Sequence, residues 1–257
     1  MTHNKIWVVI PFYLDDEALL KCVDALNSGT YRNFEIYIRD NSNDNIFFTA
    51  AINQGIRAGL ADPQVSDFLV LNQDCFLEQD ALAALKAHLD QFSQCGIACP
   101  LQIDDQRQVT WGGSLDAFPA GKHYILPIDS FEEPFETYWA NGACMLIRRT
   151  AVEEIGLLDK NMRFICSDSD YSFTARARGW EVHVVPTARA EHALNSSASN
   201  ASEELTRIKM KDVLYFYDKW ISGGLYSSIS LEGQGLDLNT IKIRMNAVRK
   251  NLQRSGG

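Results

Sequence analysis

Short apolar runs alternate with amphipathic helical patterns over the first part of the chain. Ile6–Ile10 is an apolar run that ends at Pro11, and apolar residues between Asp15 and Ser28 then recur at helical spacing. The same alternation predicts strands over 34–38, 68–71 and 97–100, and helices over 48–60 and 80–92. Strands that alternate with helices favour an α/β fold with a mostly parallel central sheet flanked by helices.

The second part of the chain is less regular. Its pattern predicts strands over 108–115, 143–148 and 182–186, a helix over 168–178, and a short helix ending at 156 that begins at a capping box of Thr150 and Glu153. Residues 195–202 are rich in Asn, Ser and Ala, which predicts a mobile loop. Two more helices are predicted over 203–220 and 239–254. We therefore expect one large domain over 1–203, the candidate catalytic domain, and a C-terminal helical appendage over 204–257.

Charge and cysteine content narrow the class of protein. The net charge of the 257 residues is −9, but residues 205–257 carry nine Lys or Arg against four Asp or Glu, so this part is +5 and the remainder −14. An acidic body argues against nucleic acid as a partner. The six cysteines form no Cys-x-x-Cys pair, so structural zinc is not expected. No apolar run approaches the ~18 residues of a membrane span, and we expect a cytoplasmic protein.

Carboxylates stand where an α/β sheet usually binds its ligand. Asp40 and Asp74 each follow a predicted strand, and Asp168 precedes a predicted helix. Carboxylates at such places hold a hard divalent cation that neutralises a diphosphate. Each residue also has a structural alternative: an Asx-turn for Asp40, a turn or helix cap for Asp74, and an N-cap for Asp168, with Asp170 favouring the helix dipole.

Three other residues also allow two interpretations. A single histidine such as His192 is more often structural than a metal ligand, although Glu191 beside it would orient it as a ligand. Trp111 and Trp139 adjoin small residues. Aromatic faces pack on sugar rings, but a tryptophan is as readily a core residue.

Several short motifs appear in a fixed order over residues 5–195. They are Val8–Phe12, Ile38–Ser42 (like VDNxS), Asn45–Phe48 and Asn53–Ile56 (like NxGF and NxGI), Leu71–Asp74 (like LNPD), Asn141–Arg149 (like GAxxLxRR), Asp168–Trp180 (like the ED-containing helix) and Glu191–His192. Each motif is weak by itself, but their order and spacing make the set specific. Together they resemble family 2 of the inverting glycosyltransferases, which have the GT-A fold.

The resemblance implies roles for particular residues. It implies Asp168 as the general base, and Asp74 and His192 as ligands of a divalent metal, Mg²⁺ or Mn²⁺. The residues that it implies for binding a nucleotide diphosphate-sugar donor are Pro11, Phe12, Asp40, Asn41, Asn45, Asn53, Asn72, Gln73 and Asp74. Those implied for binding the acceptor are Trp111, Trp139, Asn141, Gly142 and Asp170.

The chain also departs from the family pattern. Ser167 replaces the glutamate that usually precedes the base, Asn72 leaves Asp74 as the only carboxylate of its element, and Phe47 replaces a glycine. These changes keep open a catalytically impaired sugar-nucleotide-binding module with the same fold. A nucleotidyltransferase is a weaker alternative, because the segment 11–15 after the first strand has no glycine.

The sequence predicts the donor and the acceptor only as broad chemical classes. The Asn72–Asp74 element resembles that of rhamnosyltransferases, so dTDP-rhamnose or a UDP-hexose is expected as donor, with a saccharide or lipid-linked acceptor of polysaccharide or glycoconjugate biosynthesis. The basic residues of 205–257 and the aromatic stretch 213–217 with Trp220 suit contact with the inner membrane face. Packing of the same aromatic residues against the catalytic domain, or a homodimer through these helices, is the alternative.

Overall fold

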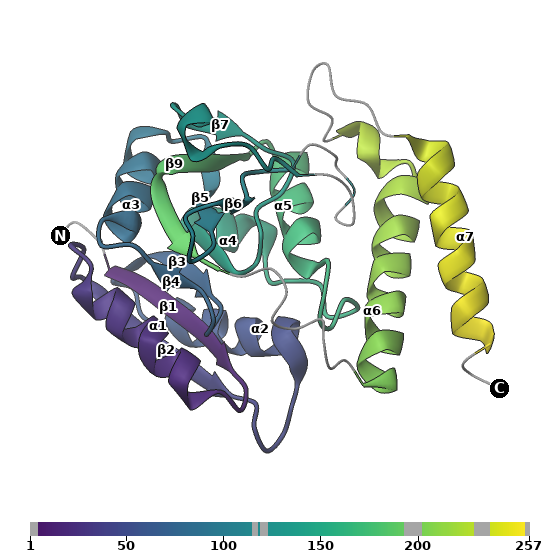
Figure 1. The fold of residues 1–257 in the computed structure, drawn as a ribbon, viewed down its shortest axis with the longest axis horizontal. Helices are drawn as coiled ribbons and strands as arrows, with labels where there is room; N and C mark the ends of the chain where they lie inside the picture. The colour runs from purple at the N-terminus through teal and green to yellow at the C-terminus, as the bar shows by residue number, and fades with distance from the viewer. Residues whose placement is uncertain (1–4, 115–117, 119–122, 193–201, 229–236, 255–257) are drawn as a thin grey trace.

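The fold is described from a computed structural model that covers residues 5–114, 118, 123–192, 202–228 and 237–254 (Figure 1). Its strands are β1 (Lys5–Phe12), β2 (Phe34–Asp40), β3 (Val65–Leu71), β4 (Phe76–Leu77), β5 (Cys95–Ile103), β6 (Val109–Trp111), β7 (Phe135–Glu136), β8 (Cys144–Arg148) and β9 (Glu181–Glu191). Its α-helices are α1 (Asp16–Ser28), α2 (Phe47–Leu60), α3 (Ala81–Gln91), α4 (Arg149–Ile155), α5 (Ser167–Ala177), α6 (Glu203–Phe216) and α7 (Leu238–Arg254). The predicted loop over 195–202 lies outside the described residues except for Ser202.

The strands form one sheet in the order β2-β1-β3-β8-β5-β9-β4, with β6 paired to β5 and β7 paired to β9. β1 is parallel to β2 and β3, and β5 is parallel to β9. β8 lies between these two groups and is antiparallel to both β3 and β5. The prediction of an α/β fold is confirmed, and its mostly parallel sheet is better described as two parallel groups joined by an antiparallel strand.

Helices pack on both faces of the sheet and bury its central strands. The middle of β1 and almost all of β3 and β5 are buried, as expected for strands covered on both sides. α2 lies so close to β1 that there is no room for a side chain at two positions. A Cβ atom at Gly55 would lie 2.3 Å from Val9, and one at Gly59 would lie 2.6 Å from Trp7. Glycine at these positions therefore sets the distance between helix and sheet.

Two predicted boundaries are wrong. The short helix begins at Arg149, with no side-chain cap, so Thr150 and Glu153 do not form a capping box. Glu153 instead forms an ion pair of 2.7 Å with Arg149 one turn earlier. The strand predicted over 108–115 is only Val109–Trp111, followed by an isolated bridge between Ser114 and His123.

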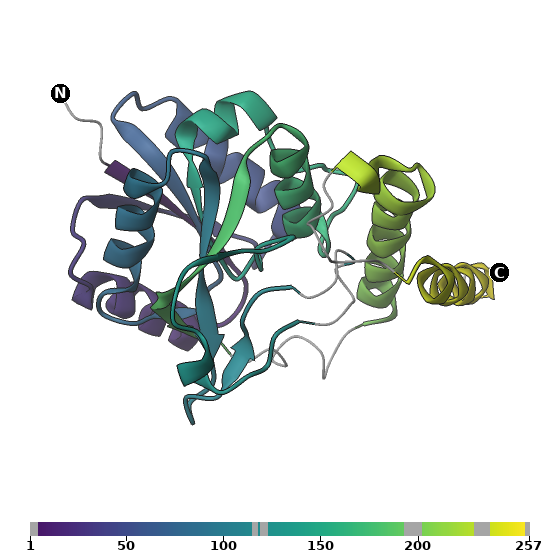
Figure 2. The same cartoon turned by 90° about the horizontal axis from the view of Figure 1, so that it is seen from above.

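The C-terminal helices pack on the body of the protein. α6 lies beside α5, and α7 covers the outer side of α6 (Figures 1 and 2). Phe216 is fully buried and Trp220 is 4% exposed, in the same hydrophobic cluster as residues of the sheet. Most of the aromatic stretch is therefore core, as the packing alternative predicts, whereas Tyr215 is 37% exposed. None of the helices in the described part of the chain has the length and apolar character needed to span a bilayer.

Candidate active site

A cavity of about 1170 Å³ opens at the carboxyl ends of β1 and β3. Eight of the residues implied by the resemblance for the donor, the metal and the base line it: Pro11, Asn41, Asn45, Asn72, Gln73, Asp74, His192 and Asp168. Trp139, Asn141 and Gly142 from the implied acceptor set line it as well. Parallel strands bring these residues together because their carboxyl ends meet at one edge of the sheet.

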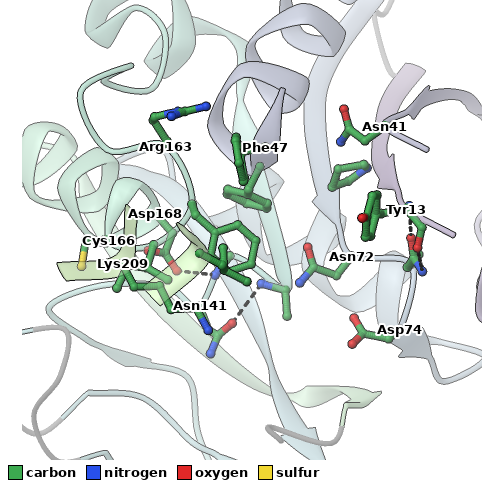
Figure 3. A pocket seen from close by; sticks show the side chains of 18 of the residues that line it. Tyr13, Asn41, Phe47, Asn72, Asp74, Asn141, Arg163, Cys166, Asp168 and Lys209 are labelled. Carbon is green, nitrogen blue, oxygen red and sulfur yellow. Dashed lines mark hydrogen bonds between the residues drawn. The ribbon is translucent and has the colours of Figure 1, made fainter. Parts of the chain in front are cut away.

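Two sides of this cavity differ in construction (Figure 3). We call the side with Tyr13, Asn41, Gln73, Asp74 and His192 the sheet side, since these residues follow or adjoin strands. We call the side with Phe47, Arg163, Phe164, Asp168 and Lys209 the helix side, since these residues belong to α2, α5, α6 and the segment before α5.

Asp168 is held rigidly on the helix side. Its Oδ2 accepts a hydrogen bond of 2.8 Å from the backbone N–H of Gly142, and its Oδ1 accepts one of 2.8 Å from Ser169. A Cβ atom at Gly142 would lie 3.0 Å from Oδ2, so glycine permits this close approach. Burial raises the pKa of Asp168, and the N–H donors only partly offset that rise. The carboxylate is thus fixed in place and made more basic than an exposed one.

The helix start that presents Asp168 is itself unusual. Cys166, the residue before α5, has φ of 67°, in the left-handed region that non-glycine residues seldom adopt. Leu14 and Phe47 have positive φ as well, at 55° and 65°, and each adjoins or lines the cavity. Such conformations cost ~1–3 kcal/mol each and cluster at functional sites.

Asp74 and His192 meet on the sheet side. The Asp74 Oδ1 atom and the His192 Nε2 atom are 3.7 Å apart. Two ligands of one octahedral cation at ~2.1 Å are separated by ~3 to 4 Å, so this pair fits a shared Mg²⁺ or Mn²⁺. Burial, only partly offset by the Asp74 carboxylate, lowers the pKa of His192, which keeps the imidazole neutral as a ligand must be.

Gln102 orients His192. The His192 Nδ1 atom lies 2.9 Å from Gln102 Oε1, and that oxygen can only accept. With Oε1 facing the ring, Nδ1 carries the proton and Nε2 presents its lone pair toward Asp74. Gln102 is fully buried on β5 and was not predicted from the sequence, where nothing marks it.

The loop after β1 is fastened to the loop after β3. The backbone N–H of Tyr13 donates to Gln73 Oε1 over 2.6 Å, and Gln73 Nε2 donates back to the Tyr13 carbonyl over 3.2 Å. Gln73 therefore shapes this part of the sheet side through the backbone, and Tyr13 is a lining residue that the sequence analysis missed.

Five implied site residues do not line the cavity: Phe12, Asp40, Asn53, Trp111 and Asp170. Phe12 is 8% exposed, and Asp40 accepts a hydrogen bond from the N–H of Ser42, the Asx-turn alternative. Asn53 exchanges two hydrogen bonds of 2.9 Å with the backbone of Leu158. Asp40 is thus held in a local turn, Asn53 by a tertiary contact, and Phe12 by burial.

The acceptor roles of Trp111 and Asp170 are corrected. Trp111 is 1% exposed and packs against Trp139 at 5.9 Å between ring centroids, so Trp111 is a core residue and only Trp139 of the two lines the cavity. Asp170 is 3% exposed; its Oδ1 accepts from Trp220 Nε1 at 2.6 Å and lies 2.7 Å from Lys219 Nζ. Because a buried carboxylate needs such partners, Asp170 connects the C-terminal segment to α5 and does not face the cavity.

A second group of potential ligand atoms lies elsewhere. Among the described residues, one group offers three potential metal-ligand atoms that all lie within 4.8 Å of one another. Its members are His88 on α3, Cys95 on β5 and His183 on β9. His183 Nδ1 is 2.8 Å from His88 Nε2, and His183 Nε2 is 3.1 Å from Glu181. Hydrogen bonding among these side chains accounts for the arrangement, and burial lowers the pKa of His88 to about 4.

Comparisons with known proteins define the class. A family model described as "Glycosyltransferase like family 2" matches residues 48–210. The match covers more than half of the chain, so this protein belongs to that family. No curated protein sequence matches at a significant level.

The structural comparison agrees on the fold. A structure titled "Crystal structure of GalNAc-T7 with UDP, GalNAc and Mn2+" matches 84% of this chain and 48% of its own with a TM-score of 0.60 and 13% sequence identity. The chain therefore spans about half the length of that neighbour, and the likeness is one of GT-A fold. With the family match, it confirms the fold predicted from the sequence.

Proposed function

We propose that this protein is a metal-dependent, inverting glycosyltransferase that moves a sugar from a nucleotide diphosphate-sugar to an acceptor hydroxyl. The observation that carries the proposal is the division of the cavity: a fixed carboxylate, Asp168, on the helix side and a carboxylate–imidazole pair, Asp74 and His192, on the sheet side. A base and a cation site on different sides suit a single displacement at a sugar held between them.

In this mechanism Asp168 takes the proton of the acceptor hydroxyl as its oxygen attacks the anomeric carbon. The bond from that carbon to the diphosphate oxygen breaks, and its electron pair leaves with the nucleoside diphosphate. Asp74 and His192 would hold the divalent cation, which when bound supplies charge stabilisation for the diphosphate. Because attack and departure occur on opposite faces of the sugar, the anomeric configuration inverts.

The departures from the family pattern do not remove any of these groups. Ser167 is buried, contacts Thr49 Oγ1 over 2.8 Å and does not line the cavity, whereas Asp168 does. Asn72 leaves one carboxylate in its element, but His192 stands 3.7 Å from that carboxylate as a second ligand. Both observations support an active enzyme over an impaired binding module.

We further propose dTDP-rhamnose or a UDP-hexose as donor, and Mg²⁺ or Mn²⁺ as the cation, in polysaccharide or glycoconjugate biosynthesis in the cytoplasm. Exposed basic residues of α7, Lys242 and Arg244, support peripheral contact with an anionic inner membrane face, with a homodimer through these helices as the alternative. Co-sedimentation with anionic and neutral vesicles separates the two.

The direct test is a panel of nucleotide-sugars, each incubated with and without divalent cation, with release of nucleoside diphosphate as the readout. We expect one donor class to be consumed only with cation present, and the anomeric configuration of the product, read by NMR, to be inverted. Absence of turnover with every donor, or a retained configuration, contradicts the proposal.

A further inference from the structure

The helix side carries two cations that the mechanism above does not use. Arg163 and Lys209 both line the cavity. The Arg163 guanidinium carbon lies 4.4 Å from the ring centroid of Phe47, and Lys209 Nζ lies 5.3 Å from that of Phe164. The two rings meet edge to face with centroids 6.3 Å apart. We call these four residues the cationic cluster.

Within the described residues, neither cation is held in an ion pair. No described carboxylate forms an ion pair with Arg163 or Lys209. Asp212 acts on Arg163 electrostatically, but its Oδ2 already accepts the backbone N–H groups of Phe164 and Ile165 at 2.7 and 3.0 Å. The other acids on this side are Asp168, which is held by Gly142, and Glu204 at the start of α6.

Of the basic residues of α6, only Lys209 lines the cavity. Leu205, Lys209 and Val213 recur every four residues along α6 and all line the cavity, so one face of this helix borders it. Arg207 and Lys211 on the same helix are exposed and do not line the cavity. A lysine thus interrupts an otherwise apolar stripe at the place where the stripe faces the cavity.

Phe47 is held in place at an energetic cost. Its φ of 65° is left-handed, and its N–H is fixed by a 2.9 Å hydrogen bond to Asn45 Oδ1. A phenylalanine gains nothing from this backbone conformation, which glycine adopts freely. The phenylalanine ring covers the Arg163 guanidinium beside the cavity, a contact that glycine could not make.

The donor does not account for these cations. Its diphosphate is assigned to Asp74 and His192 on the sheet side, and Figure 3 places Arg163 and Lys209 on the opposite side, with Asp168. An anion bound near Asp168 would be repelled by that carboxylate unless cations compensate it.

We propose, on the basis of the function proposed above, that the acceptor is anionic: a saccharide that carries a carboxylate or phosphate group, which Arg163 and Lys209 bind while the rings of Phe47 and Phe164 contact its apolar parts. Two sources share this chemistry, a carboxylate on an acceptor sugar and a phosphate that links the sugar to a lipid. The cationic cluster is thereby the specificity determinant for the acceptor.

The test uses three acceptor probes with the full-length protein: neutral methyl hexosides, the matching methyl hexuronosides, and short-chain prenyl diphosphate hexosides. Binding is followed by ligand-observed NMR in the presence of UDP and Mg²⁺, and turnover by nucleoside diphosphate release. We expect one of the anionic probe sets to bind at least about tenfold more tightly than the neutral set, since a charge-assisted hydrogen bond contributes ~1.5–3 kcal/mol. The anionic set that binds shows whether the negative charge of the acceptor is a sugar carboxylate or a phosphate that links the sugar to a lipid.

Charge reversal then assigns the effect. Lys209→Glu and Arg163→Glu should each weaken anionic-probe binding about tenfold or more, whereas the Kd of UDP should change less than twofold. Lys211→Glu is the matched control, because it makes the same charge change on the exposed face of α6.

Three outcomes overturn the inference: no preference for either anionic set, weakening by Lys211→Glu equal to that by Lys209→Glu, or a rise in the Kd of UDP in the Lys209 and Arg163 variants, which would assign the cations to the donor. Anionic probes that bind through Lys209 while no nucleotide-sugar is ever cleaved would leave the binding assignment intact and refute transfer instead.

Discussion

The sheet side and the helix side of the cavity are built by different means. Sheet-side residues such as Asp74 and Gln73 follow strand ends, so parallel pairing of β1 with β3 places them together. The helix side depends on left-handed residues at Phe47 and Cys166, and on a helix from the C-terminal segment that supplies Lys209. The sheet side therefore follows from strand topology, whereas the helix side depends on segments that tertiary packing brings to the cavity.

The largest expected effect is on the helix side. Asp168→Asn keeps an oxygen to accept the N–H of Gly142 but cannot take a proton at neutral pH, so transfer should fall by ~10²–10⁴-fold. UDP affinity, measured by calorimetry with Mg²⁺, should not change, because the sheet side is intact. Transfer within a few-fold of wild type would exclude Asp168 as the base.

The matching change on the sheet side should affect both binding and chemistry. Removing one cation ligand with Asp74→Ala should lower transfer ~10²-fold or more and weaken UDP binding in Mn²⁺, because the cation supplies several kcal/mol. Excess EDTA should do the same to the wild type. Asp80→Ala, an exposed acid at the start of α3 with no side-chain capping bond, is the control. Full activity in EDTA would remove the cation from the mechanism.

Gln102 gives a finer probe of the sheet side. Gln102→Leu should weaken Mn²⁺ binding by ~10–100-fold, as measured by electron paramagnetic resonance with UDP present, because His192 loses the acceptor that fixes its tautomer. Gln102→Glu retains an acceptor oxygen and should restore most of the affinity. If both variants bind Mn²⁺ alike, the role of Gln102 is only structural.

The smallest effect concerns the link between the C-terminal segment and the helix side. Lys219→Met removes the ion pairs of Lys219 with Asp170 and with Asp159 and leaves the buried Asp170 with the hydrogen bond from Trp220, which should cost ~1–3 kcal/mol of unfolding free energy in urea titrations. The value is below that of a fully buried pair because the Lys219 side chain is 28% exposed. Lys211→Met, on the exposed face of α6, should change stability by less than ~0.5 kcal/mol. Equal effects of the two would show that the pair contributes nothing.

The sequence predicted which residues stand at strand ends, although Phe12 and Asp40 there do not line the cavity. Strand periodicity and the edge at which parallel strands end place Asp74, Asn72 and Pro11 without knowledge of tertiary contacts. Trp111 and Asp170 were misplaced, because a pattern cannot tell whether a tryptophan or an acid on an element faces a cavity or a neighbouring helix.

Other helix-side features left weaker signals. Lys209 follows Leu205 and precedes Val213 by four residues each, a stripe that is visible in the sequence once the helix is known to border the cavity. The left-handed φ at Phe47 has no sequence signal beyond the absence of the expected glycine. Such positions are fixed by tertiary packing and are read only from the structure.

The position of α6 has a consequence for how acceptor preference can diverge. One face of this helix borders the cavity through Lys209, while Phe216 at its end belongs to the core and Asp212 holds the segment before α5. If Lys209 binds the acceptor as proposed, exchange of the C-terminal segment between relatives would replace this part of the cavity wall in one event and leave the strand ends unchanged. Such a chimera would also need partners for Asp170 in the incoming segment.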